Sequence, residues 1–167
     1  NRRYVSGFAG SAGFLVISRN QAFLATDFRY TEQAAQQSPN FEVVKSGRDW
    51  SWLVELLNGQ SFPRIGFESQ DLTVEAYRQL STSLKELPST SRPTLVAAPG
   101  TVESLRTVKD QQELTLLQRA IDVADVAMEA VSKTIEPGET EIQVAWRLEK
   151  AMRESGADSL SFDTIVA

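Results

Sequence analysis

The 167-residue chain contains no cysteine and no histidine. Without cysteine it has no disulfide framework, no cysteine-ligated zinc site and no thiol nucleophile. Without histidine it lacks the commonest general base and the usual zinc ligand, and a Ser–His pair is excluded. Carboxylates are therefore the titratable catalysts that remain.

Positive charge and long apolar runs are also scarce. The chain has 17 Lys and Arg against 22 Asp and Glu, a net charge of −5. Nucleic-acid binding needs a basic face, so we expect no nucleic-acid partner. No run approaches the roughly 18–20 apolar residues that span a bilayer, so we expect no membrane association. The first residues do not resemble a signal peptide, and a chain without cysteine is compatible with the cytoplasm, where we place the protein.

Hydrophobic residues make up 41% of the chain, enough for a core. The pattern of these residues changes at Pro99-Gly100-Thr101, which predicts a first domain over residues 1–101 and a second over 102–167. The first part alternates short apolar runs with amphipathic segments. Strands are expected at 14–17, 22–25, 41–44, 65–68 and 94–98, and helices at 31–37, 50–57 and 73–87. This alternation predicts an α/β fold with a mixed sheet flanked by helices.

The first two apolar runs, 14–17 and 22–25, predict a hairpin buried on both faces. A loop with three glycines, residues 7–13, precedes them. Such a loop can cradle phosphate, but its spacing does not match a phosphate-binding motif, and a tight turn into the strand is the favoured interpretation. Asp27 and Arg29 at the end of the second strand are either catalytic helpers or a surface ion pair, and we favour the pair.

Two other features have a functional and a structural interpretation. Trp50 and Trp52 can form a stacking platform for a base or sugar, but no basic residues are interleaved with them, so core packing is favoured. Asp122 and Asp125 lie three residues apart on a predicted helix and can hold a hard cation. A solvated helix face is the favoured interpretation.

The second part begins with the strongest helix signal in the chain, residues 110–135. Apolar residues recur at steps of three and four: Leu114, Leu117, Ile121, Ala124, Met128, Val131 and Ile135. Asp110 with Glu113 predicts a capping box at its start, and Pro137-Gly138 predicts its end.

A second helix is predicted over residues 140–155. Thr140 and Gln143 form its capping box, and Gly156 favours its end there. Residues 161–167, SFDTIVA, predict a strand without a partner strand in this chain. Because an unpaired apolar edge promotes aggregation, we expect the chain to be part of a longer protein.

Several stretches together resemble the creatinase/prolidase/Xaa-Pro aminopeptidase family, in particular its aminopeptidase P and prolidase branch. They are YVSGFAGSAGFLVIS, ATDFRYTEQA and RIGFESQDLT upstream, then L-R-x-x-K-D-x-x-E before the long helix, PGETE and SFDTIVA. The resemblance runs in order over essentially the whole chain. It implies a creatinase-type amino-terminal domain whose start is missing, followed by the first helices and strand of a truncated α+β pita-bread catalytic domain.

The resemblance also implies an activity: removal of an N-terminal residue ahead of proline, with two divalent ions (Mn or Co, or Zn) that activate a bridging water. The family's five metal ligands would lie beyond Ala167. This chain is therefore expected to bind no metal, to contain no catalytic residue and to be inactive alone. Proline-containing peptides and a second copy of the protein, in a dimer, are the expected partners.

The resemblance implies which residues of the first domain contact substrate. They are Phe8 in the glycine loop and Arg29 with Tyr30 at the strand end. The competing interpretation makes Phe8 a core residue and Arg29 only the partner of Asp27. Alternatives for the whole protein are prolidase (Xaa-Pro dipeptidase) activity, creatine amidinohydrolase chemistry, and a non-catalytic peptide- or histone-binding module.

Overall fold

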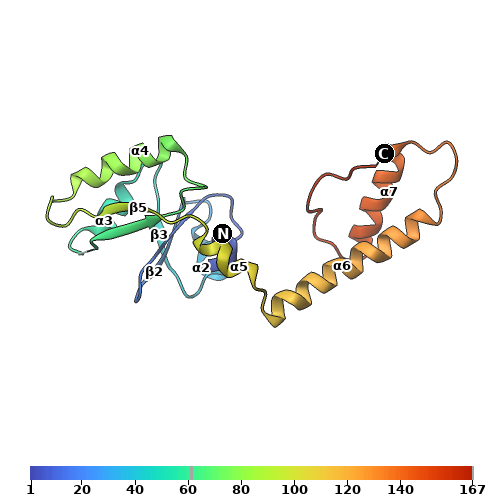
Figure 1. Ribbon diagram of the computed structural model, residues 1–167, viewed down its shortest axis with the longest axis horizontal. Coiled ribbons are helices and arrows are strands. Elements are labelled where there is room, and N and C mark those ends of the chain that lie inside the picture. The colour runs from blue at the N-terminus through green and yellow to red at the C-terminus, as the bar shows by residue number, and fades with distance from the viewer. Residues whose placement is uncertain (61, 167) are drawn as a thin grey trace. The chain divides into compact units, whose positions relative to one another are not determined.

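A computed structural model describes residues 1–60 and 62–166 and contains two compact units, Asn1–Val108 and Lys109–Ala167 (Figure 1). The first unit extends seven residues beyond the predicted boundary at 101, because a short helix follows that point. Each unit has its own hydrophobic core.

The first unit has the mixed α/β organisation predicted from the sequence. In chain order it contains α1 (Arg2–Ser6), β1 (Phe14–Ile17), β2 (Ala22–Thr26), α2 (Thr31–Gln37), β3 (Glu42–Lys45), α3 (Ser51–Leu57), β4 (Arg64–Phe67), α4 (Val74–Ser83), a 3-10 turn η1 (Leu84–Glu86), β5 (Thr94–Ala97) and α5 (Thr101–Thr107). Strands β1, β2 and β3 form a mixed sheet, antiparallel between β1 and β2 and parallel between β2 and β3. Strands β4 and β5 form a separate parallel pair, so the five predicted strands are divided between two sheets.

The main core of this unit lies between the strands and helices α3 and α4. Trp52, Leu53 and Leu57 of α3 pack with Leu80 of α4 and with Ala25 of β2. In Figure 1, α4 lies along the parallel pair β4–β5. Burial of these side chains supplies most of the favourable free energy of folding.

The two tryptophans belong to this core. Trp50 is 9% exposed and Trp52 is 5% exposed, and their ring centroids lie 6.0 Å apart. Both rings also contact Phe14, the first residue of β1. The core interpretation of these residues is confirmed, since buried rings cannot serve as a platform for a base or sugar.

Two local expectations for the first unit were wrong, and two short helices were missed. Strand β1 is not buried on both faces: it is an edge strand, and Phe14 and Ile17 are 45% and 55% exposed. Helices α1 and α5 were not predicted, because neither has a side-chain cap at its N-terminus. The predicted helix 73–87 ends as α4 at Ser83 and continues only as the 3-10 turn.

The second unit is a helical hairpin of α6 (Gln111–Ser132) and α7 (Glu141–Glu154). Both predicted capping boxes are confirmed: Asp110 and Glu113 exchange side chain–backbone hydrogen bonds at the start of α6, and Thr140 and Gln143 do so at α7. Ala127 and Val131 of α6 pack against Leu148 of α7 in a small core.

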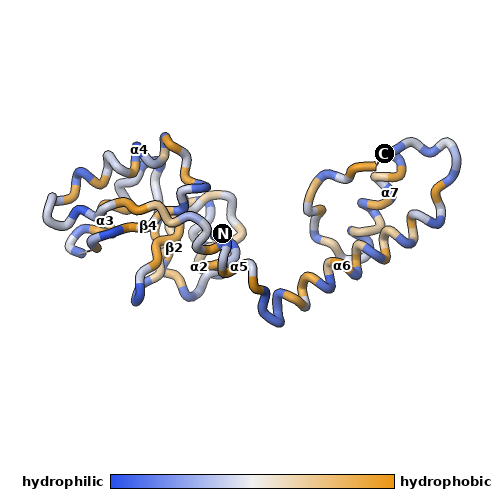
Figure 2. The backbone as a smooth tube through the Cα atoms, in the orientation of Figure 1, coloured by the Kyte–Doolittle hydropathy of each residue, from blue (hydrophilic) through white to orange (hydrophobic). Residues whose placement is uncertain are grey.

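Helix α6 buries little of its predicted apolar stripe. Leu114, Leu117 and Ile121 are about half exposed, and Figure 2 shows hydrophobic and hydrophilic residues alternating along the helix. The predicted strand at the end of the chain is wrong for residues 161–166, which contain no strand, and Ala167 lies outside the described residues. A strand needs a hydrogen-bonding neighbour, and none of the described segments pairs with this one.

Candidate functional site

The residues predicted to contact substrate come from two neighbouring segments of the first unit. One is the glycine loop, residues 7–13, which joins α1 to β1. The other is the turn 27–30, which joins β2 to α2. A hydrogen bond between the two hydroxyl oxygens of Ser11 and Tyr30, 2.7 Å apart, connects the segments.

The glycine loop is held by hydrogen bonds along most of its length. The Arg2 guanidinium donates to the carbonyl oxygens of Gly13, at 2.7 Å, and of Gly10. Thr26, fully buried on β2, donates its hydroxyl proton to the carbonyl oxygen of Ala12 at 2.7 Å. The Ala9 N–H donates to the side-chain oxygen of Gln37 at 2.9 Å. The loop backbone is therefore fixed by side chains from three different elements.

Phe8 lies beneath this loop and has no exposed surface. Its ring packs with Leu24 and Ala34, and it meets the Tyr30 ring edge-on with centroids 6.0 Å apart. The Arg2 guanidinium lies 5.4 Å from the ring centroid. Because a side chain without exposed surface cannot touch a ligand in this conformation, the structure gives Phe8 the role of supporting the loop.

Arg29 and Asp27 form a two-point ion pair. The Nε and Nη2 atoms of Arg29 donate to the two carboxylate oxygens of Asp27 at 3.0 and 2.7 Å. Arg29 lowers the pKa of Asp27 below its ordinary value, chiefly through the side-chain hydrogen bonds, and Asp27 raises the pKa of Arg29. The favoured interpretation of this pair is thus confirmed, although the Arg29 side chain remains 57% exposed and can make further contacts.

Tyr30 joins the parts of the site. Its ring contacts the Phe8 ring and the Arg29 guanidinium, which is 5.2 Å from the Tyr30 centroid, and its hydroxyl is hydrogen-bonded with that of Ser11. The roles of Ser11, Arg2 and Thr26 were not predictable from the residue types alone. Only the glycine spacing pointed to this loop, and its anchoring depends on contacts between residues distant in sequence.

No cluster of three or more His, Cys, Asp or Glu that could hold a metal ion occurs among residues 1–60 and 62–166. Asp122 accepts a hydrogen bond from Gln118 at 2.8 Å. Asp122 and Asp125 are both exposed, as expected for a solvated helix face. The described residues therefore do not fit a site for two divalent ions.

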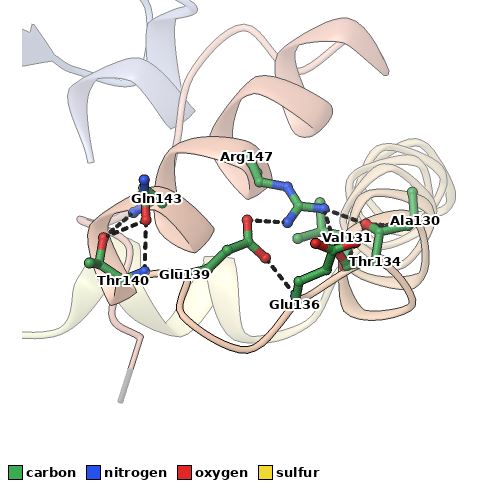
Figure 3. A network of polar contacts seen from close by, with 8 residues as sticks. All are labelled: Ala130, Val131, Thr134, Glu136, Glu139, Thr140, Gln143 and Arg147. Carbon is green, nitrogen blue, oxygen red and sulfur yellow. Dashed lines mark hydrogen bonds and ion pairs between the residues drawn. The ribbon is translucent and has the colours of Figure 1, made fainter.

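A second polar network closes the helical hairpin of the second unit (Figure 3). The Arg147 guanidinium of α7 contacts the carboxylate of Glu139 and donates to the Thr134 carbonyl oxygen at 3.1 Å. The other Glu139 oxygen accepts from the Glu136 N–H at 2.8 Å. These contacts lower the pKa of Glu139, first through the Glu136 N–H and then through Arg147. The network is a connection between α6, the turn and α7.

Sequence comparison relates the two units to two families. The model of the Creatinase/Prolidase N-terminal domain matches residues 1–108, and that of Metallopeptidase family M24 matches residues 115–167. The "Uncharacterized peptidase YqhT" of Bacillus subtilis is 39% identical over 168 aligned positions, which cover all of this chain and 46% of that protein.

Over nearly its whole length, the chain resembles part of the solved structures of two peptidases. An Xaa-Pro dipeptidase from Bacillus anthracis is 35% identical with a TM-score of 0.81, covering 97% of this chain and 44% of that one. An X-Pro aminopeptidase from Thermotoga maritima is 31% identical with a TM-score of 0.84, covering 97% and 45%. The chain thus spans less than half the length of these relatives. None of the helices in the described part is long and apolar enough to cross a membrane.

Proposed function

Because the chain belongs to the creatinase/prolidase family, we propose that the full-length protein is an Xaa-Pro aminopeptidase, which hydrolyses the bond between an N-terminal residue and proline. The main support is that one chain matches, in order, the Creatinase/Prolidase N-terminal domain and Metallopeptidase family M24. The likeness to an X-Pro aminopeptidase over 97% of the chain supports peptides with proline in the second position as the proposed substrate class.

Prolidase activity is the second candidate, favoured by the similar likeness to an Xaa-Pro dipeptidase. The two activities differ in the length of peptide accepted. The test is incubation of full-length protein with the dipeptide Ala-Pro and the tripeptide Ala-Pro-Ala, with release of free alanine measured. An aminopeptidase releases alanine from the tripeptide, whereas a prolidase releases it only from the dipeptide. No release from either peptide would refute both candidates.

Divalent metal ions are the cofactors that membership of a metallopeptidase family implies. We propose two such ions, Mn or Co, or Zn, bound by residues of the full-length protein outside this chain. In such enzymes the ions supply Lewis-acid chemistry at the bond that is cleaved. Loss of activity in a chelator, with recovery in Mn²⁺ or Co²⁺ but not in Mg²⁺, would support this choice.

The 167-residue chain alone is proposed to be inactive and to bind no catalytic metal tightly, because several oxygen and nitrogen ligands must converge to hold such ions. Calorimetric titration with Mn²⁺ tests this proposal directly. Stoichiometric submicromolar binding, or hydrolysis of Ala-Pro by this chain, would contradict it.

We also propose that the full-length protein is a cytoplasmic homodimer. For the first unit we propose that Arg29 and Tyr30 contact the substrate. The support is the exposure of Arg29 beside a fixed loop. Arg29→Ala in the full-length enzyme should lower kcat/KM with little change in Tm. A loss of stability with kinetic parameters per folded molecule unchanged would show a purely structural role instead.

A further inference from the structure

We propose that a surface pocket of the first unit binds a small zwitterion, a free amino acid or dipeptide that carries one ammonium and one carboxylate group. Residues of α4 and of the segment 48–50, which leads into α3, line this pocket, and its volume is about 440 Å³. Its lining contains no residue of the glycine loop or of the turn 27–30. The inference is therefore separate from the substrate contact proposed above.

Helix α4 supplies one side of the pocket. Glu75, Arg78, Gln79 and Thr82 line it, and their spacing of three, one and three residues places them on one face of the helix. Leu80, 4% exposed, packs into the main core from another face of α4. The helix is therefore held in place by the core while its polar side chains reach the pocket.

The segment before α3 supplies the other side, with Arg48, Asp49 and Trp50. Trp50 is 9% exposed, and its ring centroid lies 4.8 Å from that of Phe14 and 6.0 Å from that of Trp52. These contacts fix the Trp50 ring, so the part of it that lines the pocket is a rigid apolar surface beside the charged groups.

Four charged groups share this pocket, the guanidinium groups of Arg48 and Arg78 and the carboxylates of Asp49 and Glu75. None of them forms an ion pair with another. Within residues 1–60 and 62–166, the two arginine side chains have neither a hydrogen-bond partner nor an ion-pair partner. Both signs of charge are therefore available to a ligand.

The two carboxylates are bonded to neutral donors. Asp49 Oδ1 accepts from the Ser51 hydroxyl at 2.7 Å and from the Ser51 N–H at 3.2 Å. The side-chain hydrogen bond from Ser51 is the main cause that lowers the pKa of Asp49 below its ordinary value, which keeps this group ionised at neutral pH. Glu75 accepts from the Gln79 amide at 3.0 Å. Neither carboxylate has a cationic partner in the described part of the chain.

This arrangement favours a zwitterion over a simple ion. An anion that approaches Arg48 and Arg78 also meets the negative charges of Asp49 and Glu75, and a cation meets the opposite combination. A molecule with an ammonium and a carboxylate group can place each beside a charge of opposite sign. The hydroxyl of Thr82 also lines the pocket and has no partner among the described residues, so it can add a hydrogen bond.

The size of the pocket agrees with a small ligand. Ligand pockets in proteins usually measure about 300–1,000 Å³, so this one lies in the lower part of the range. Because Arg48, Arg78, Asp49 and Glu75 are exposed to solvent, each ion pair should contribute little. We therefore expect a dissociation constant of about 1–10 mM.

The test is NMR titration of the ¹⁵N-labelled 167-residue chain at constant pH and ionic strength. The ligands are Ala-Ala, N-acetyl-Ala-Ala, Ala-Ala amide and alanine. We expect a saturable shift of the Trp50 indole N–H signal with Ala-Ala, no shift of the Trp146 signal of α7, and binding of each blocked dipeptide at least about threefold weaker, because each lacks one ion pair. Equal binding of a blocked dipeptide, or no saturable shift at Trp50, would overturn the proposal. The tighter ligand of Ala-Ala and alanine identifies the source of the zwitterion.

Two variants separate the two charges of the ligand. Arg78→Gln should remove the preference for Ala-Ala over its C-terminal amide, and Glu75→Gln the preference for Ala-Ala over its N-acetyl form. Each should weaken binding of Ala-Ala about two- to fivefold. Arg19→Gln is the matched control, because Arg19 is an exposed arginine in the turn between β1 and β2 and does not line the pocket. Unchanged affinity and preference in both test variants would refute the site. An inactive full-length enzyme would refute the peptidase proposal alone.

Discussion

The buried hydroxyl of Thr26 donates to the carbonyl oxygen of Ala12 across 2.7 Å and joins the glycine loop to the central strand of the three-stranded sheet. Thr26 has no exposed surface, so water cannot replace this bond. Loop geometry and sheet stability are therefore linked through one side chain.

Thr26→Val should destabilise the first unit by about 1–3 kcal/mol, because the new side chain has the same shape but leaves the Ala12 carbonyl without its donor. Urea unfolding monitored by circular dichroism measures the change. Thr94→Val is the control: Thr94 is an exposed strand residue, and this variant should change the free energy of unfolding little. Equal effects of the two substitutions would contradict the role of this bond.

Arg147→Gln should weaken the helical hairpin, because it removes the donors to Glu139 and to the Thr134 carbonyl. We expect faster amide hydrogen exchange throughout α7 and a fall in Tm of a few degrees. Lys150→Gln serves as the comparison, since the Lys150–Glu154 pair is exposed and spans 3.7 Å. Such pairs contribute little to stability. The prediction fails if α7 exchanges at the same rate in both variants.

Glu139 should make the stability of the hairpin depend on pH. Its pKa in the folded chain lies below the ordinary value of 4.5, through the Glu136 N–H and then Arg147. The stabilisation is therefore present above pH 4.5 and is lost as the pH falls through the folded-state pKa.

The difference in unfolding free energy between the unchanged chain and Glu139→Gln should accordingly be present at pH 6 and shrink below pH 4.5. Glu141→Gln is the control, because it makes the same change from carboxylate to amide at an exposed position on the first turn of α7. A difference that stays constant from pH 6 to pH 3 would show that the charge of Glu139 does not stabilise the hairpin.

Limited trypsin digestion should cut the chain first after Lys109. Residues 108–110 belong to no helix or strand, and Val108 is 78% exposed. Exposed irregular segments between compact units are the usual sites of proteolysis. Mass spectrometry should therefore detect fragments that correspond to the two units. A first cut at Arg19 or Arg64 would contradict this division.

Local signals in the sequence predicted local structure well. The capping boxes of α6 and α7 each involve residues three apart, so the residue types alone were sufficient to place both helix starts. The Asp27–Arg29 pair is equally local, and its ion-pair interpretation is confirmed. Helix α1 was missed because it has only five residues and no side-chain cap; it ends at Ser6 and is followed by Gly7 in the left-handed conformation.

Features that depend on distant partners could not be predicted in the same way. The apolar run of β1 gave no indication that the strand lies at a sheet edge, because burial depends on which strands pair. Phe8 is buried by contacts with Tyr30 and Leu24, both more than ten residues away. Arg2 and Thr26 acquire their roles only when the chain folds and brings them to the glycine loop.

Proline-dependent hydrolysis by the full-length protein tests the central claim most directly. The measurement is release of free alanine from Ala-Pro-Phe and from the matched peptide Ala-Ala-Phe, followed by mass spectrometry with added Mn²⁺ and again after metal chelation. We predict release from the proline peptide alone, and only with the metal ion present. Equal release from both peptides, or none from the proline peptide with Mn²⁺ or Co²⁺, would contradict the assignment as an Xaa-Pro aminopeptidase.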